Sequence, residues 1–244
     1  VRVKLSTPNT KSITMSAKGA YLVKEAGRLF TDGTLTVSAS GGTVSVSHSA
    51  EGALYSGGTV TIERVNLSRD AGYLRFTTSC GTRMYLGNFS VTASGGLLTI
   101  VNRVPMTHYL YGVVGHEMND SFPLEALKAQ AVTARCYALR AIRSSGTYDI
   151  LDTSDDQVYK GYTSTYYNVI AAVDAVADVA LYYGSDVMVC YYSASNGGYM
   201  LKPSSVWSGA SPFDGAYTEG PDAYDMKNTS SPRELIAIPS AFFP

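Results

Sequence analysis

Apolar and polar residues alternate in short runs over roughly the first hundred positions of the chain. Residues 34–37 (TLTV) and 59–62 (TVTI) are two such runs, and turn signals such as the glycine pair at 41–42 separate them. A period of two residues puts successive side chains on opposite faces of a strand, and glycine permits tight turns. The pattern predicts antiparallel β-structure over residues 1–101. The uneven spacing of the turns indicates no internal repeat.

The periodicity then changes to that of helices. Residues 105–118 and 123–143 repeat apolar positions every three or four residues, and residues 165–176 do so more briefly. Further on, residues 179–183 and 187–192 flank a Gly-Ser-Asp turn, which predicts a β-hairpin. The whole pattern predicts an α+β protein with a β-rich N-terminal part followed by a mixed α/β part.

The amino-acid composition argues against nucleic acid or anionic lipid as a binding partner. The 244 residues are enough to bury a substantial core. Lys and Arg together number 19 against 20 Asp and Glu, so the chain has no overall positive field to attract nucleic acid or anionic lipid. Charged residues make up only 16%, against about 25% in an average domain, while tyrosines number 19. A surface rich in Tyr, Ser and Thr is typical of carbohydrate-facing proteins, although Tyr-rich strands are equally an ordinary β feature.

Neither the cysteines nor the apolar runs of the sequence show whether the protein lies inside or outside the cytoplasm. Three scattered cysteines do not make a disulfide framework, and their odd number leaves at least one thiol free. The sequence contains no run of about 18 apolar residues and no leader pattern. It therefore indicates either a cytoplasmic protein or a chain whose flanking segments are missing, and the abrupt ending AFFP favours the second.

The helix that begins at Pro123 carries two cations on its apolar face. Advancing about 100° per residue places Lys128 and Arg135 inside the apolar stripe. Lysine can extend from such a position to water, but an unpaired buried arginine costs several kcal/mol. We therefore expect a carboxylate or an anionic ligand near Arg135. The apolar stripe itself consists of Leu124, Leu127, Ala131, Ala134, Ala138, Leu139 and Ile142.

The preceding helix offers that carboxylate, because its apolar face ends on Glu117. The negative end of the helix dipole and partial burial both favour the protonated carboxyl that a general acid needs. A nearby Lys128 or Arg135 would favour the ionised form instead, and the sequence does not decide between these effects. A purely structural ion pair between Glu117 and Arg135 is an equal alternative.

Two segments resemble metal-binding motifs but lack residues that those motifs require. His116 and Glu117 resemble the start of a zinc-protease motif, but position 120 is Asp where a second His is required. The aspartates between residues 152 and 156 lack the glycine and the final glutamate of a calcium loop, so they indicate a solvated turn.

A serine hydrolase is also disfavoured. Ser193 and Ser195 lie outside any G-x-S-x-G elbow, and no His follows them in the chain. Gly197 and Gly198 either let the backbone approach a ligand closely or belong to a plain loop.

Four segments together resemble the SpoIID/LytB family, over about residues 97–210. Residues 109–118 read YLYGVVGHEM, and residues 122–138 read FPLEALKAQAVTARCYA. Residues 156–161 (DQVYKG) and 192–198 (YSASNGG) agree in order and spacing. The resemblance implies a β-rich flanking region over residues 1–96, a SpoIID/LytB-like catalytic domain over 97–215, and an irregular segment over 216–244.

The resemblance implies a peptidoglycan lytic transglycosylase that cleaves glycan strands, lacking stem peptides, to 1,6-anhydro-muramic acid ends during sporulation and engulfment. Glu117 takes the catalytic acid/base position and Arg135 a supporting catalytic position, in which Arg135 or Lys128 orients Glu117 or binds the lactyl carboxylate of muramic acid. One carboxyl suffices, because the C6 hydroxyl of the substrate is the nucleophile. The implied substrate-binding residues are Lys128, Gln157, Tyr159, Tyr192, Ser193, Ser195, Asn196 and Gly197.

Partners and cofactors follow from the same resemblance. Family members that act in sporulation work with a cell-wall amidase, whereas LytB-like members are amidase enhancers. The alternative function is therefore a non-catalytic module that binds glycan and activates an amidase. A third possibility is a scaffold anchored in the cell wall. Some relatives hold zinc through Cys and His in the loop that here reads DTSDD, so we expect no metal and no other cofactor. We expect an extracytoplasmic location in the cell envelope, and contact with a membrane only through an N-terminal anchor upstream of Val1.

Overall fold

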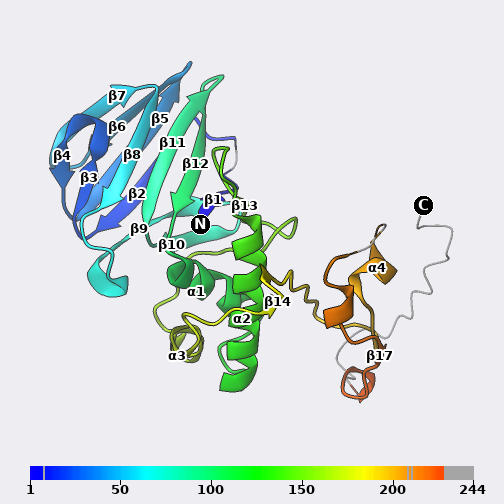
Figure 1. Ribbon diagram of the computed structural model, residues 1–244. Helices are drawn as coiled ribbons and strands as arrows, with labels where there is room; N and C mark the ends of the chain where they lie inside the picture. The colour runs from blue at the N-terminus through cyan, green and yellow to red at the C-terminus, as the bar shows by residue number, and fades with distance from the viewer. Residues whose placement is uncertain (8, 208, 210, 228–244) are drawn as a thin grey trace. The chain divides into compact units, whose positions relative to one another are not determined.

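The chain forms two compact units, Val1–Val179 and Ala180–Pro244. The computed structural model describes residues 1–7, 9–207, 209 and 211–227. In the first unit two β-sheets are followed by α-helices, which confirms the predicted α+β class with a β-rich N-terminal part (Figure 1). The expected limits of the regions at residues 96 and 215 stay predictions, and the C-terminal segment from residue 228 onward lies outside the described residues.

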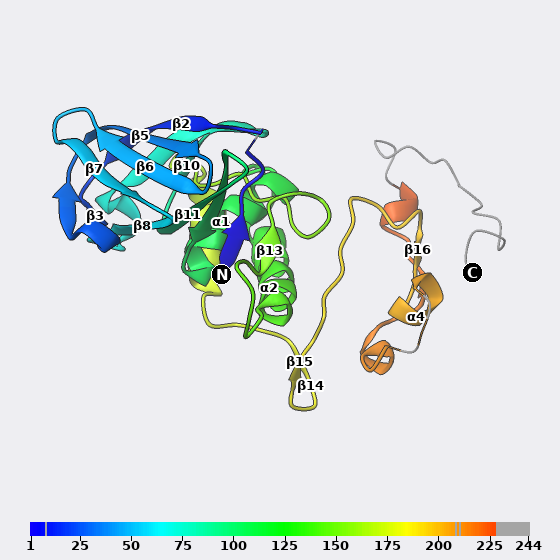
Figure 2. The same cartoon turned by 90° about the horizontal axis from the view of Figure 1, so that it is seen from above.

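Two sheets pack against each other in the first unit, as the view in Figure 2 shows. The seven-stranded sheet has the order β13 (Ile150–Leu151), β1 (Arg2–Lys4), β12 (Leu97–Arg103), β11 (Asn88–Ser94), β8 (Thr59–Arg64), β3 (Tyr21–Val23) and β4 (Arg28–Phe30). The six-stranded sheet has the order β10 (Gly81–Tyr85), β9 (Tyr73–Thr78), β2 (Ser12–Lys18), β5 (Gly33–Ser40), β6 (Thr43–His48) and β7 (Gly52–Gly57). Short 3₁₀ turns follow β3 at Lys24–Ala26 and β8 at Arg69–Ala71.

The alternating sequence pattern explains the sheets. In β2, Ile13, Met15 and Ala17 are buried while the residues between them are exposed. Neighbouring strands repeat this alternation, so the inner faces of both sheets supply one apolar core. The pairings are antiparallel within both sheets except for that of β1 with β13, which is parallel.

Three helices follow the strands, as predicted. They are α1 (Met106–Glu117), α2 (Leu124–Ala141) and α3 (Tyr167–Ala175). Pro105 and Pro123 stand immediately before α1 and α2, where the fixed φ of proline suits a helix start. Figure 1 shows the three helices grouped beside the ends of the strands.

A chain of aromatic rings joins the helices to the core between the sheets. The ring centroids of Tyr109 in α1 and Tyr159 lie 5.1 Å apart, and those of Tyr159 and Tyr85 in β10 lie 5.8 Å apart. Tyr85 then stacks on Phe76 of β9 at 4.8 Å. Such ring contacts add to the free energy gained from burying the rings. The helix that carries Glu117 therefore rests on the core of the same unit.

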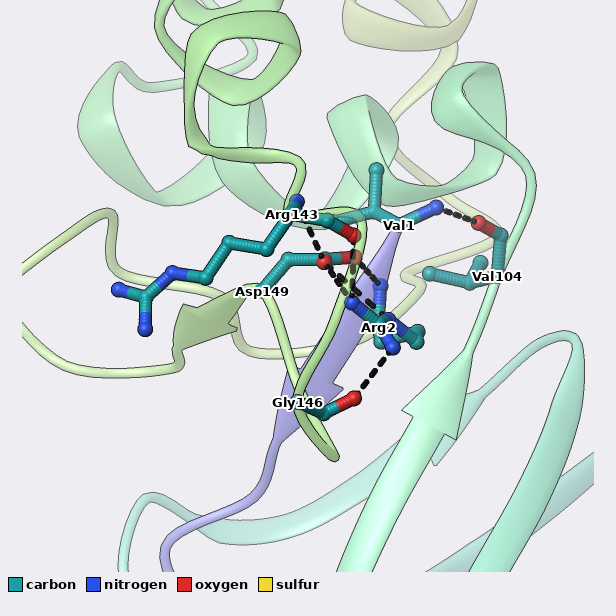
Figure 3. A network of polar contacts seen from close by, with 6 residues as sticks. All are labelled: Val1, Arg2, Val104, Arg143, Gly146 and Asp149. Carbon is teal, nitrogen blue, oxygen red and sulfur yellow. Dashed lines mark hydrogen bonds and ion pairs between the residues drawn. The ribbon is translucent and has the colours of Figure 1, made fainter.

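The first strand is tied to the loop after α2 by a polar network (Figure 3). The Arg2 guanidinium donates to Asp149 Oδ1, with Nη2 at 2.5 Å, and to the carbonyl oxygens of Gly146 and Arg143. Backbone N–H groups of Arg2 and Arg143 also donate to the Asp149 carboxylate. Burial by itself would raise the pKa of Asp149, but these hydrogen bonds outweigh it and lower the pKa to about 2.

Asp149→Asn is expected to lower the free energy of unfolding by about 2 kcal/mol at pH 7, because the charge that Arg2 pairs with is lost. The folded-state pKa lies below the unfolded value, so the contribution is present above about pH 4 and disappears as the pH falls toward 2. Urea unfolding at pH 7 and pH 3 measures both values. Asp70→Asn, in an exposed pair with Arg69, should change stability by less than about 0.5 kcal/mol. An Asp149→Asn deficit that is the same at both pH values would contradict the assignment.

The second unit has less regular structure. It contains β14 (Tyr182–Tyr183), β15 (Asp186–Val187), β16 (Tyr199–Met200), α4 (Pro203–Val206) and β17 (Gly220–Pro221), with 3₁₀ turns at Asp214–Ala216 and Asp225–Lys227. Strands β14 and β15 pair antiparallel around Gly184 and Ser185, so the predicted hairpin is confirmed with shorter strands. Strands β16 and β17 also pair antiparallel.

Cys80, Cys136 and Cys190 form no disulfide among the described residues, in agreement with the expectation that at least one cysteine stays reduced. Among the described residues, no helix combines the length and the apolar character needed to cross a membrane.

Candidate functional site

Glu117 is the last residue of α1 and is half-buried. The seven residues that precede His116, from Tyr109 to Gly115, are all buried, so α1 lies in the core along most of its length. Glu117 Oε1 accepts a hydrogen bond from the backbone N–H of Val158 at 3.2 Å. The predicted position of Glu117 at the end of an apolar helix face is thus confirmed, and one carboxylate oxygen is fixed by a neighbouring segment.

Arg135 lies in the middle of α2 and is only 7% exposed. Its Nε and Nη2 atoms are buried and have no hydrogen-bond partner among the described residues. Burial lowers the pKa of the guanidinium, and the negative charge of Asp178 partly opposes this effect. The expected inward arginine is confirmed, and a structural ion pair with Glu117 does not satisfy these two nitrogens. A buried guanidinium in this state is suited to an anionic group of a ligand.

The rest of the predicted α2 stripe is only partly buried. Leu127, Ala131, Ala134 and Ala138 are buried, as expected. Leu124 and Ile142, at the two ends of the stripe, are 42% and 48% exposed, so their predicted burial is wrong. The Lys128 Nζ reaches outward to Glu125 Oε1 at 2.7 Å, as a lysine on an apolar face can. Its proposed contact with substrate stays a prediction.

Residues 157 and 158 connect the two helices. Gln157 Nε2 donates to the Ala134 carbonyl oxygen of α2 at 3.3 Å, and Gln157 Oε1 accepts from the Tyr109 hydroxyl at 3.1 Å. The next residue, Val158, donates to Glu117. This segment therefore contacts both the end of α1 and the turn of α2 that contains Ala134, next to Arg135 in the chain. That Glu117, Arg135 and Gln157 form one site stays a prediction.

Gln157 and Tyr159 are buried side chains that pack against the helices of the candidate site. Each is 1% exposed, and the Tyr159 hydroxyl donates to Asn102 Oδ1 at 2.8 Å. Burial raises the pKa of Tyr159 well above its usual value, so this hydroxyl stays protonated. Because neither side chain reaches the surface, we assign both residues to holding the helices, not to direct contact with substrate as the sequence predicted.

Gly112→Ala is expected to destabilise the protein by about 3 kcal/mol. A Cβ at Gly112 of α1 would lie 2.5 Å from the Tyr159 ring and 2.6 Å from the Gly161 carbonyl oxygen, and the backbone atom cannot move aside cheaply. Urea unfolding measures the loss. Gly58→Ala is the matched control, since its Cβ would meet nothing within 4 Å. Equal stability of Gly112→Ala and wild type would show that Tyr159 does not pack on α1.

His116, beside Glu117 in the chain, is a neutral group at physiological pH. Burial, followed by the positive charges of Lys160 and Arg83, lowers its pKa to about 4. The imidazole packs against the Tyr166 ring at 6.0 Å between centroids. The His116 imidazole therefore carries no positive charge beside Glu117 at neutral pH.

The aspartates after β13 belong to the framework. Asp152 is fully buried and accepts hydrogen bonds from the Ser6 N–H at 2.9 Å and the Ser6 hydroxyl at 2.5 Å. Asp156 accepts from the Leu151 N–H and the Tyr137 hydroxyl. The predicted solvated turn is therefore wrong at Asp152. Among the described residues, no group of three or more His, Cys, Asp or Glu side chains is arranged to hold a metal ion.

The other half of the predicted site belongs to the second unit. Ser195 Oγ donates to Asp225 Oδ2 at 2.7 Å, and the Asn196 side-chain amide donates to Asp222 Oδ2 at 2.9 Å. Ser193 Oγ donates to the Ser195 carbonyl oxygen at 2.9 Å. Together with Tyr192 and Gly197, these residues form one loop of the second unit. Their proposed contact with substrate stays a prediction.

Asp222 and Asp225, which hold this loop, were not predicted from the sequence. Nothing in their local pattern marks them, because the loop that they hold lies about 30 residues earlier in the chain.

The fold and the first unit's site define an α+β protein that places one half-buried carboxyl and one buried guanidinium on consecutive helices. Residues 94–183 match the family described as Stage II sporulation protein, SpoIID. The resemblance to the SpoIID/LytB family that the sequence predicted is thus confirmed over this region.

Curated relatives agree with this assignment. The chain is 42% identical to the amidase enhancer of Bacillus subtilis over 43% of its own length and 14% of the relative's. It is 30% identical to stage II sporulation protein D of Bacillus subtilis, over 46% of this chain and 38% of the relative. An uncharacterized protein of Brachyspira hyodysenteriae is 35% identical, over 54% of this chain and 36% of the relative. The chain thus spans less than two fifths of the length of these relatives.

Proposed function

We propose that this chain is a peptidoglycan lytic transglycosylase with Glu117 as its acid/base catalyst. The proposal rests on one observation: residues 157 and 158 contact both the helix that ends in Glu117 and the helix that carries Arg135, a buried guanidinium with unsatisfied donors. A glycan with a reacting acetal and an anionic substituent requires both groups.

In the reaction, the Glu117 carboxyl donates its proton to the glycosidic oxygen, and the bond from this oxygen to the anomeric carbon breaks. The substrate's C6 hydroxyl attacks the anomeric carbon and returns its proton to the Glu117 carboxylate. The product is a 1,6-anhydro sugar, no water is consumed, and the catalyst ends in its starting state. The Val158 N–H keeps the carboxyl oriented throughout.

Arg135 binds the lactyl carboxylate of the muramic acid ring. Because its Nε and Nη2 atoms are buried, they become the two donors of a bidentate contact only when neighbouring side chains move aside and admit the carboxylate. Peptidoglycan is outside the cytoplasm, so this function places the protein in the cell envelope. A cell-wall amidase that removes stem peptides would prepare the substrate during sporulation.

A second candidate function is activation of such an amidase without glycan cleavage. The similarity to a relative named amidase enhancer, at 42% identity, favours this alternative. In it Arg135 and the loop of the second unit bind glycan, and Glu117 serves only to orient the helices.

Mass spectrometry of glycan strands freed of stem peptides separates the two functions. New 1,6-anhydro ends that depend on Glu117 support the transglycosylase. Glycan binding without new ends, together with faster cleavage by an added amidase, supports the activator.

A further inference from the structure

Arg83 points inward from the edge of the six-stranded sheet. It lies on β10, the last strand of that sheet, opposite Phe76 of β9, whose side chain is buried in the core. Residues opposite each other in a sheet project from the same face, so the Arg83 side chain also leaves from the inner face. Its Nε atom is buried and has no hydrogen-bond partner among the described residues, and its Nη1 donates to the Thr82 carbonyl oxygen at the long distance of 3.5 Å. The half-buried Arg83 guanidinium therefore keeps donors for another group.

Lys160 comes to the same part of the first unit from another segment. Its backbone N–H donates to the Gly112 carbonyl oxygen of α1 at 3.3 Å. Two residues later the chain runs along β10, where Tyr162 and Met84 form an isolated antiparallel bridge. Met84 follows Arg83 directly, so Arg83 and Lys160 belong to adjoining segments that both lie against α1.

Both cations act on the end of α1. After burial, the positive charges of Lys160 and Arg83 are the causes that lower the pKa of His116, the residue before Glu117. Neither cation forms an ion pair with any residue that the structure describes. Two cations that gather without a carboxylate partner create a positive potential that attracts an anion. The neighbourhood of Glu117 thus has a positive side that the reaction assigned to Glu117 does not use.

We propose that Arg83 and Lys160 form an anion subsite for the lactyl carboxylate of a muramic acid ring other than the ring that is cleaved. Muramic acid recurs at every second ring of the glycan, so a bound strand presents further lactyl groups beside the reacting one. A guanidinium and an ammonium together suit one carboxylate, because both donate charge-assisted hydrogen bonds. The identity of the ligand rests on the proposed function, whereas the anion preference rests on the two cations alone.

This subsite recognises a chemical change that an amidase makes. A stem peptide joins the lactyl group through an amide, which is neutral, and hydrolysis of that amide leaves a carboxylate on the sugar. Arg83 and Lys160 therefore favour strands from which the peptides have been removed. Arg83 also lies outside residues 94–183, which match the family, so the subsite adds a residue from the β-rich part of the chain.

The test compares three glycan strands by calorimetry on the full chain that carries Glu117→Gln, which prevents turnover. They are strands freed of stem peptides, the same strands with their lactyl carboxylates converted to neutral methylamides, and strands that keep their peptides. Arg83→Met and Lys160→Met should each weaken binding of the freed strands about tenfold and change binding of the methylamide strands less than about twofold. Arg83→Lys keeps the charge and should recover part of the affinity.

Arg28→Met and Lys11→Met are the matched controls, because each removes one exposed cation from the β-rich part and changes the net charge equally. Both should bind the freed strands as the parent does. An equal loss on freed and methylamide strands would overturn the inference, since it indicates a structural role. Binding of peptide-bearing strands that depends on Arg83 as strongly would overturn the lactyl assignment in favour of a peptide carboxylate.

The outcome is separable from that of the proposed function. If Arg83→Met distinguishes the freed from the methylamide strands but wild type produces no 1,6-anhydro ends, only the catalytic proposal fails. If wild type produces these ends and both Arg83→Met and Lys160→Met cleave the freed strands with the wild-type KM, only the anion subsite fails.

Discussion

Glu117→Gln is expected to reduce glycan cleavage about 1,000-fold while the protein stays folded. The amide oxygen still accepts the Val158 N–H bond, so the geometry at the end of α1 is kept. The amide cannot donate a proton to the glycosidic oxygen or take one from the C6 hydroxyl. Counting 1,6-anhydro ends by mass spectrometry over time gives the rate, and urea unfolding shows that stability is unchanged.

The matched control for this variant is Glu51→Gln, which removes a carboxylate from an exposed turn between β6 and β7. It should cleave glycan at the wild-type rate. Residual activity of Glu117→Gln within a factor of about ten of wild type would remove Glu117 from the acid/base role. In that case the amidase-activator function becomes the leading explanation of the site.

Arg135→Met should have opposite effects on stability and on function. Methionine has a similar length and carries no charge, so replacing a buried guanidinium that has unsatisfied nitrogens removes a desolvation cost. We expect the free energy of unfolding to rise by about 1–2 kcal/mol. Glycan cleavage should fall about 100-fold, because the lactyl carboxylate loses its partner. Chemical unfolding and the assay for anhydro ends measure the two changes on the same sample.

Two further variants sharpen this prediction. Arg28→Met on β4 replaces an exposed arginine and should leave both quantities near their wild-type values. Arg135→Lys keeps the charge without the planar fork and should recover part of the activity. A loss of several kcal/mol in Arg135→Met would instead show that the guanidinium has a structural partner in the folded protein.

Local sequence patterns were enough to predict the strands and helices and to single out Glu117 and Arg135. A period of two residues over the first hundred positions fixed the strands, and a helical period fixed α1, α2 and α3, because each pattern depends on neighbours within one element. The same local patterns placed Glu117 at the end of a buried helix face and Arg135 inside one. These are properties of a single helix, so no distant contact was needed to find them.

Contacts between segments far apart in the chain could be identified only from the folded protein. Gln157 and Tyr159 are buried because α1, α2 and the sheet core enclose them, which no local pattern records. Asp152 is buried because the Ser6 N–H and hydroxyl, nearly 150 residues away in sequence, satisfy its carboxylate. In the same way, Asp222 meets the loop at Asn196 only after the chain has folded. Burial and hydrogen bonding of polar side chains depend on such long-range partners, whereas periodicity depends on near neighbours alone.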